Sequence, residues 1–444
     1  MTGLRRTVGA ATLLGMVGLE VCLAFGYYAL ATVLPQVCRG FDADRAYSVA
    51  AAAPFITSVV GLVVASPWVD RVGPRWPLTW GFAGLVTGEV GCAAAPGIAV
   101  FVAGRLVLGL GTGIVGVALY GLISHAVPPE HRSAVFGWLN GSWLIPSLTG
   151  PLLAALMAQR WGWRSVFWAV AVLMAVSYTI LAVGIRRRRM VPEHGARRAV
   201  PWLWAALAAV ALIALHLGGE DPSAAGTTAS AVGLVLTVLA MRRVLPAGTL
   251  AARAGAPRLI ALRGVLAAGA GAAEVYVPYY LQHQRGVTLA GSGFVLAATA
   301  VGWTVGASVQ AGWARRCGPE RLLRWCAVLG PMGPVAVLVV IVTTGPVWLI
   351  PAGLAVMGLG LGAAMPQISA ASMDLTPTAE HASLGGALQL CEAAAGGALL
   401  AVTGIVLAHG GSHSLAAAYA VLVAVGALGL VVAGHGVGET AQPS

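Results

Sequence analysis

Charged residues are scarce in this sequence, at 9% of the 444 positions, whereas hydrophobic residues make up 58%. A soluble globular protein carries about 25% charged residues, so this chain cannot cover a water-facing surface and a soluble globule is excluded. The mean hydropathy of +0.85 points the same way. The expected environment is a lipid bilayer, whose thickness sets an element length of about 20 residues per span.

The motifs of several other protein classes are also missing. The six cysteines include no CxxC pair and no regular spacing, so neither a disulfide framework nor a metal site is expected. A nucleotide-binding loop of the GxxxxGK[ST] type is absent, which argues against ATP as the energy source. The short loops offer no cluster of His, Asp and Ser, so a membrane enzyme is disfavoured. We expect no cofactor and no metal.

The net charge of +11 comes from arginines that lie in short loops between apolar runs. This placement is typical of membrane topology signals, not of a surface that binds nucleic acid. The first apolar run follows Arg5 and Arg6, as in a signal peptide, but it continues to Pro35 without a clear small-residue cleavage site. It is therefore interpreted as a retained first helix.

The long apolar runs predict an all-α polytopic membrane protein with fourteen transmembrane helices. They lie at about 9–34, 46–67, 76–95, 98–124, 133–157, 165–184, 201–218, 225–241, 260–281, 289–312, 322–342, 346–370, 383–408 and 414–435. With a cytoplasmic N-terminus, 20 of the 26 basic residues fall in inner loops. This bias predicts a multi-pass protein of the plasma (inner) membrane with both termini in the cytoplasm.

Two loops of the chain are copies of one another. Four identities occur at one constant offset: Trp68 with Trp313, Arg71 with Arg316, Gly73 with Gly318 and Pro74 with Pro319. Each loop follows the second span of a group of six, once the pair of runs at 201–241 is set aside. Two six-span units in parallel orientation are a known transporter design. The predicted domains are an N-terminal six-helix bundle at 1–185, a basic connector with two extra helices at 186–257 and a C-terminal six-helix bundle at 258–444.

Several motifs in order make the chain resemble the major facilitator superfamily, in particular its fourteen-span drug–proton antiporter branch. The loop motif between spans two and three is matched by Asp70, Arg71, Gly73 and Arg75, and the span-four motif by Arg105, Gly109, Gly111 and Gly113. The antiporter motif of span five is matched by Pro146, Gly150 and Pro151. In span one, Gly26 stands where that branch often carries an aspartate. The resemblance implies alternating access and the export direction.

Ionisable residues inside the spans are the candidates for proton coupling, because a charge in the bilayer costs about 2.5–3.5 kcal/mol on insertion scales. They are Glu20, Glu89, Arg105, Glu274 and Glu392. Glu89 and Arg105 lie in the outer halves of neighbouring spans and are expected to meet as an ion pair. A carboxyl group sheltered from water binds a proton more readily, since its charged form loses solvation. Interfacial solvation of Glu274 and interhelical adhesion by Glu20 and Glu392 are the alternatives.

Aromatic and amide residues inside the spans are candidates for a substrate cavity. They are Tyr27, Tyr28, Asn140, Trp143, Tyr276, Tyr280, Trp303, Gln367 and Gln389. An aromatic cavity suits bulky apolar or cationic compounds through buried area and cation–π contact. Other Trp residues, such as Trp161, mark the membrane interface instead. The loop residues Asp70, Arg71, Gly73 and Arg75 are interpreted as a cytoplasmic gate, with simple anchoring as the alternative.

Together these features predict a proton-coupled secondary transporter that exports small amphipathic compounds by alternating access. The expected partners are a small-molecule substrate, protons and the lipid bilayer, with no nucleic acid, and the chain is expected to be a monomer. A proton-linked importer or a transporter of lipid-like metabolites is the first alternative. A polytopic membrane enzyme and a channel are the others.

Overall fold

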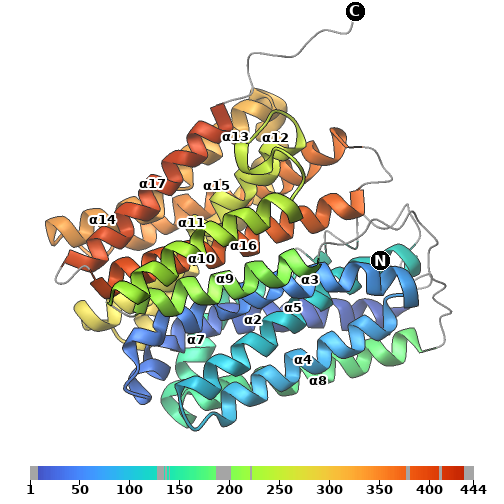
Figure 1. Ribbon diagram of the computed structural model, residues 1–444, viewed down its shortest axis with the longest axis horizontal. Coiled ribbons are helices and arrows are strands. Elements are labelled where there is room, and N and C mark those ends of the chain that lie inside the picture. The colour runs from blue at the N-terminus through green and yellow to red at the C-terminus, as the bar shows by residue number, and fades with distance from the viewer. Residues whose placement is uncertain are drawn as a thin grey trace, which may run out of the picture. The chain divides into compact units, whose positions relative to one another are not determined.

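The computed structural model describes residues 9–127, 135, 138–139, 141–186, 202–220, 223–376, 381–409 and 413–434. Within these residues the secondary structure is helical throughout, with no strand (Figure 1). The chain divides into two compact units, residues 1–209 and 210–444. Eleven described helices are long and apolar enough to cross a membrane. The predicted all-α polytopic fold is confirmed.

The first unit contains six long helices that follow the predicted apolar runs. They are α2 (Ala10–Gly40), α3 (Tyr47–Val72), α4 (Arg75–Ala94), α5 (Ile98–Ala126), α7 (Leu144–Trp161) and α8 (Arg164–Ile185), with the short 3-10 helix η1 (Asp44–Ala46) before α3. Its core consists of aliphatic and aromatic residues that include Met16, Leu78, Phe82 and Leu122. The polar residue Asn140, predicted for the substrate cavity, lies outside the described residues.

The second unit begins within α9 (Trp202–Glu220) and continues through α10 (Ala224–Val244) and the 3-10 helix η2 (Thr249–Ala251). It then contains α11 (Ala256–Gln284), α12 (Leu289–Cys317), α13 (Pro319–Leu329), α14 (Met332–Thr343), α15 (Leu349–Asp374), α16 (His381–His409) and α17 (Ser414–Gly434). Side-chain caps begin two of these helices: Ser223 accepts from the Gly226 N–H and Thr288 from the Gly291 N–H, as such hydroxyls do at helix N-termini.

One predicted span is divided in two. Helices α13 and α14 form one apolar segment, Pro319–Thr343, that is interrupted at Gly330 and Pro331. Proline has no N–H to donate to the preceding turn, so the helical ladder breaks there. Counting α13 and α14 as one segment, one described helix corresponds to each of the fourteen predicted runs, and eleven of these segments are long and apolar enough to cross a membrane.

The two units use the same order of packing. In the first unit, α2 packs on α7 and α8, α3 on α5, and α4 on α5 and α8. In the second unit, α11 packs on α16 and α17, α12 on α15, and α13 and α14 on α15 and α17. In each case the first helix of six contacts the fifth and sixth, the second contacts the fourth, and the third contacts the fourth and sixth. This shared pattern is what a duplicated unit produces.

The duplicated loops also share one backbone conformation. Gly73 ends α3 with φ 75° and Gly318 ends α12 with φ 84°. The Gly73 N–H donates to Val69 O at 2.8 Å and the Gly318 N–H to Ala314 O at 2.9 Å. A positive φ favours glycine, which explains why both copies have it at this position.

Glycines also bring the second and fourth helices of each unit into close backbone contact. A Cβ at Gly113 of α5 would lie 2.7 Å from the Leu62 backbone nitrogen of α3. A Cβ at Gly306 of α12 would lie 2.9 Å from the Ala363 backbone nitrogen of α15. Small residues at helix interfaces allow such approach in membranes.

The inserted helices α9 and α10 form a hairpin that is packed in the same manner. A Cβ at Gly218 would meet the Gly226 carbonyl oxygen at 2.6 Å, and one at Gly233 would meet the Ala211 carbonyl oxygen at 2.6 Å. Gly219, next along α9, lies directly against the side chain of Ile405 on α16. The hairpin therefore docks on the helix that also carries Glu392.

Candidate functional site

In the first unit, Glu20 and Trp143 are joined although 123 positions separate them. Glu20 lies on α2, and Trp143 is the N-cap residue of α7. The Trp143 indole N–H donates to a Glu20 carboxylate oxygen at 2.8 Å. Both side chains are partly buried. The contact is the only hydrogen bond of this carboxylate among the described residues, so its other oxygen is free to bind a proton or a cation.

Trp143, which binds this carboxylate, is also part of an aromatic cluster. The Tyr27 ring centroid lies 6.4 Å from that of Trp143, 6.5 Å from that of Phe55 and 5.2 Å from that of Tyr28. Tyr27 and Glu20 are seven residues apart on α2, which places them on one helical face. A carboxylate beside electron-rich ring faces can attract an organic cation.

The span-five motif explains how α7 reaches this cluster. A Cβ at Gly150 would lie 3.4 Å from Phe25 Cδ2 and 3.5 Å from Tyr28 Cβ of α2. The missing side chain lets α7 lie close to α2 at that level, two turns beyond Trp143. Pro146 and Pro151 of the same motif are buried.

Glu89 and Arg105 are both buried in the first unit, at 3% and 6% exposure. The ion pair expected between them is not among those of the described residues: the Arg105 Nε–H donates to the Ala50 carbonyl oxygen at 3.4 Å, and Glu89 Oε2 has no hydrogen-bond partner in this part of the chain. The second Glu89 oxygen lies 3.6 Å from where a Cβ of Gly26 would be. The Glu89 carboxyl group therefore faces α2 at the glycine position noted in span one.

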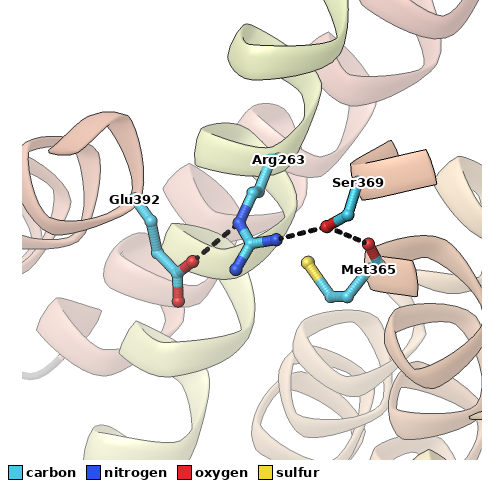
Figure 2. Close-up of polar contacts among 4 residues, drawn as sticks. All are labelled: Arg263, Met365, Ser369 and Glu392. Atoms are coloured by element: carbon cyan, nitrogen blue, oxygen red, sulfur yellow. Dashed lines mark hydrogen bonds and ion pairs between the residues drawn. The ribbon is translucent and has the colours of Figure 1, made fainter. Parts of the chain in front are cut away.

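In the second unit, Glu392 forms an ion pair with Arg263 (Figure 2). Arg263 of α11 donates from Nε to Glu392 Oε2 of α16 at 3.0 Å and from Nη1 to Ser369 Oγ of α15 at 3.2 Å. Ser369 in turn donates to the Met365 carbonyl oxygen at 3.0 Å. Three helices thus meet at one guanidinium group. A second pair, Arg258 with Glu320 at 3.3 Å, joins α11 to α13.

Sequence reasoning missed Arg263 as a site residue. It is one of the arginines counted with the inner loops, but α11 begins at Ala256, so Arg263 lies two turns inside the helix. The signal available was Pro257, since proline is favoured in the first turn of a helix. Ser369 gave no signal of its own.

Glu274 and its neighbours lie deep in the second unit. Glu274 is 6% exposed, Tyr276 is fully buried and Tyr280 is 3% exposed. The Tyr276 hydroxyl donates to the Leu400 carbonyl oxygen at 3.2 Å, and the Tyr280 hydroxyl accepts from Arg285 Nε at 2.9 Å. These tyrosine hydroxyls bind α16 and the end of α11 in the structure.

The remaining cavity candidates of the second unit lie on three helices. Trp303 of α12 is 39% exposed, and Gln367 of α15 and Gln389 of α16 are partly buried. At the predicted gate, Arg71 and Arg75 are exposed and Gly73 is buried. The side chain of Asp70 lies outside the described part of the chain.

Two helical units with the same internal packing, each with ionisable side chains inside its apolar helices, define a polytopic membrane transporter. Comparison with models of known protein families identifies the transporter family. The model of the Major Facilitator Superfamily matches residues 16–401, and the chain belongs to this family. The family and its named relatives are transporters, not enzymes.

The chain is similar to proteins named for multidrug efflux or multidrug resistance. A probable multidrug-efflux transporter of Mycobacterium tuberculosis is 26% identical over 452 residues, which cover 94% of each chain. The multidrug resistance protein MdtL of Escherichia coli is 27% identical over 153 residues, which cover 34% of this chain and 39% of that protein.

Solved structures share the fold. An auto-inhibited peptide transporter of the POT family has a TM-score of 0.70 and 15% identity, with 98% of this chain and 99% of that chain covered. A POT family transporter in complex with a thioalcohol-conjugated peptide has a TM-score of 0.72 and 15% identity, with 95% and 94% covered. At this identity the likeness concerns the fold alone.

Proposed function

We propose that this transporter exports small amphipathic compounds, with or without a positive charge, in exchange for protons. The observation that carries the proposal is the Glu20 carboxylate, bonded at 2.8 Å to the indole of Trp143, whose ring lies in one cluster with those of Tyr27, Tyr28 and Phe55. Ring faces bind apolar area and attract cations. The efflux relatives from Mycobacterium tuberculosis support the same direction of transport.

Exchange follows if a proton and a cationic compound compete for one carboxylate. Within the part of the chain that the structure describes, Trp143 is the single hydrogen-bond donor to Glu20, which leaves the second carboxylate oxygen for either ligand. A proton that binds from the outside would expel the compound there, and its release inside would make room for the next one. Glu89, Arg105, Glu274 and Glu392 remain candidates for further steps in this proton exchange, in the plasma membrane and with both termini in the cytoplasm.

The loop after α3 is proposed as a gate of this cycle. Arg71 and Arg75 are exposed at the ends of α3 and α4, so they are available to form and break ion pairs as one side of the transporter closes. Asp70→Asn is expected to slow cycling more than it weakens binding.

The test uses everted membrane vesicles that contain the full chain, with ethidium as the probe. An imposed gradient, acidic inside, should drive ethidium into the vesicles, and a protonophore should abolish this uptake. Vesicles with Glu20→Gln should lose gradient-driven uptake. If ethidium instead leaves the vesicles with the protons, the protein is a proton-linked importer and the proposed direction is wrong.

A further inference from the structure

Glu392 is bonded to only one of the two donors on one edge of the Arg263 guanidinium group. In an arginine, Nε and Nη2 form one edge that matches the two oxygens of a carboxylate. Glu392 engages this edge through one contact, Nε to Oε2 at 3.0 Å (Figure 2). The Nη2 atom and Glu392 Oε1 make no hydrogen bond among the described residues, and neither atom is buried.

The neighbouring ion pair on α11 provides a contrast. Arg258 also makes a single contact with its acid, Glu320, but its spare Nη1 atom is buried. The side chains of Arg258 and Glu320 are 12% and 51% exposed, and those of Arg263 and Glu392 are 20% and 40% exposed. The contrast lies in the spare nitrogen: Nη1 of Arg258 is enclosed by protein, whereas Nη2 of Arg263 is not.

A second contact, with an uncharged hydroxyl group, also holds the Arg263 side chain. Its Nη1 donates to Ser369 Oγ at 3.2 Å, and Ser369 is fixed by its own bond to the Met365 carbonyl oxygen at 3.0 Å. If Glu392 moves away, this anchor keeps the guanidinium group in place. The Nε and Nη2 edge would then present two donors in fixed geometry to an incoming anion.

An open guanidinium nitrogen within an apolar helix bundle requires water or a ligand. Arg263 lies seven residues into α11, roughly 10 Å from the start of that helix at 1.5 Å per residue. Unsatisfied polar groups are strongly unfavourable in hydrocarbon. The Nε and Nη2 edge is therefore suited to a planar oxyanion. Such an anion can accept two hydrogen bonds there, in place of the single one that Glu392 accepts.

We propose that Arg263 binds the carboxylate group of a small organic acid through its Nε and Nη2 edge, and that Glu392 is the chain's own competitor for this edge. The binding activity is additional to the exchange proposed above. It is measured at equilibrium without a gradient, so its failure and a failure of proton-driven export are separate results.

The test measures equilibrium binding to the purified full-length protein in lipid nanodiscs. The probes are benzoate, the neutral benzamide and the cationic benzamidine, which share one ring and differ in charge. The wild-type protein should bind benzoate more tightly than either other probe. Glu392→Gln should raise the affinity for benzoate about tenfold and leave that for benzamide unchanged, because the internal anion is gone.

Matched variants identify the residue. Arg263→Lys keeps the charge but loses the two-donor edge, so benzoate affinity should fall about tenfold, and Ser369→Ala should weaken it less. Arg258→Gln, five residues away on α11, is the control and should leave benzoate binding unchanged. An equal loss in the control would overturn the proposal.

Two further results would also overturn it: tighter binding of benzamidine than of benzoate to the wild-type protein, or no gain in benzoate affinity for Glu392→Gln. The first would make Glu392 a cation site instead. The second decides the question even if the Arg263 variants do not fold.

Discussion

At the scale of single residues, the Trp143 indole holds the carboxylate of Glu20 through one hydrogen bond of 2.8 Å. Trp143→Phe would keep a ring near Tyr27 but remove the N–H donor. Hydrogen bonds to charged groups contribute about 1.5–3 kcal/mol, and phenylalanine attracts cations less than tryptophan does. We expect the affinity for ethidium, measured by fluorescence titration, to fall about tenfold or more.

The matched control for this substitution is Trp168→Phe. Trp168 lies on α8 with 46% exposure, so the same loss of an indole there should leave ethidium affinity unchanged. Equal affinities in the wild-type protein and Trp143→Phe would remove the indole from the binding site.

Sequence reasoning found most of these residues one at a time, but not their contacts. Glu20, Tyr27 and Trp143 stand out because polar and aromatic side chains are conspicuous inside apolar runs. Their meeting depends on α2 lying beside α7, and no local pattern specifies which helices are neighbours. For Glu89 and Arg105 the sequence predicted a contact that is not found among the described residues. Their matching depth in adjacent spans indicates an ion pair, but Arg105 donates to a backbone carbonyl of α3.

At the scale of helices, the contact between α12 and α15 depends on glycines. A Cβ at Gly358 would overlap the Thr299 carbonyl oxygen and lie 3.0 Å from the Trp303 backbone nitrogen. Because these obstacles are backbone atoms, Gly358→Ala must separate the helices. Overpacking of this kind costs about 1–3 kcal/mol. We expect a lower midpoint of thermal unfolding in detergent.

Gly269→Ala on α11 is the control for Gly358→Ala. A Cβ at Gly269 has nothing within 4 Å, and alanine favours a helix over glycine by up to about 1 kcal/mol. This variant should unfold at the same or a higher temperature. A similar decrease in both variants would mean that helix packing is not the cause.

Helix boundaries were the least predictable part of the elements. The ninth span was expected to begin near residue 260, but α11 starts at Ala256. Helical hydrogen bonding continues past the apolar run into polar residues, so hydropathy marks the membrane-facing segment and not the helix ends. Arg263 lies three residues inside the predicted run at 260–281 and was counted with the loop arginines, although it lies two turns inside α11. The break at Gly330 and Pro331, in contrast, has a local cause in proline.

At the scale of the whole molecule, duplication was predictable from two short loops, and the structure gives the physical reason for their identities. Gly73 and Gly318 both adopt a positive φ at a helix end, which glycine favours. The order of helix packing, which is the same in both units, left no comparable trace in the sequence. Helix interfaces tolerate many apolar combinations of similar volume, whereas a positive φ strongly favours one residue type.

A test of coupling in the whole transporter separates proton movement from substrate movement. Glu20→Gln cannot exchange a proton at residue 20, so a gradient should no longer drive accumulation of a neutral amphipathic compound. Exchange of labelled for unlabelled compound across the membrane requires no net proton movement and should persist within about twofold. Counterflow and gradient-driven uptake are measured on the same proteoliposomes. Loss of both activities would mean that Glu20 has a structural function. Retention of both would mean that another carboxylate exchanges the proton, and Glu274→Gln is then the next variant to test.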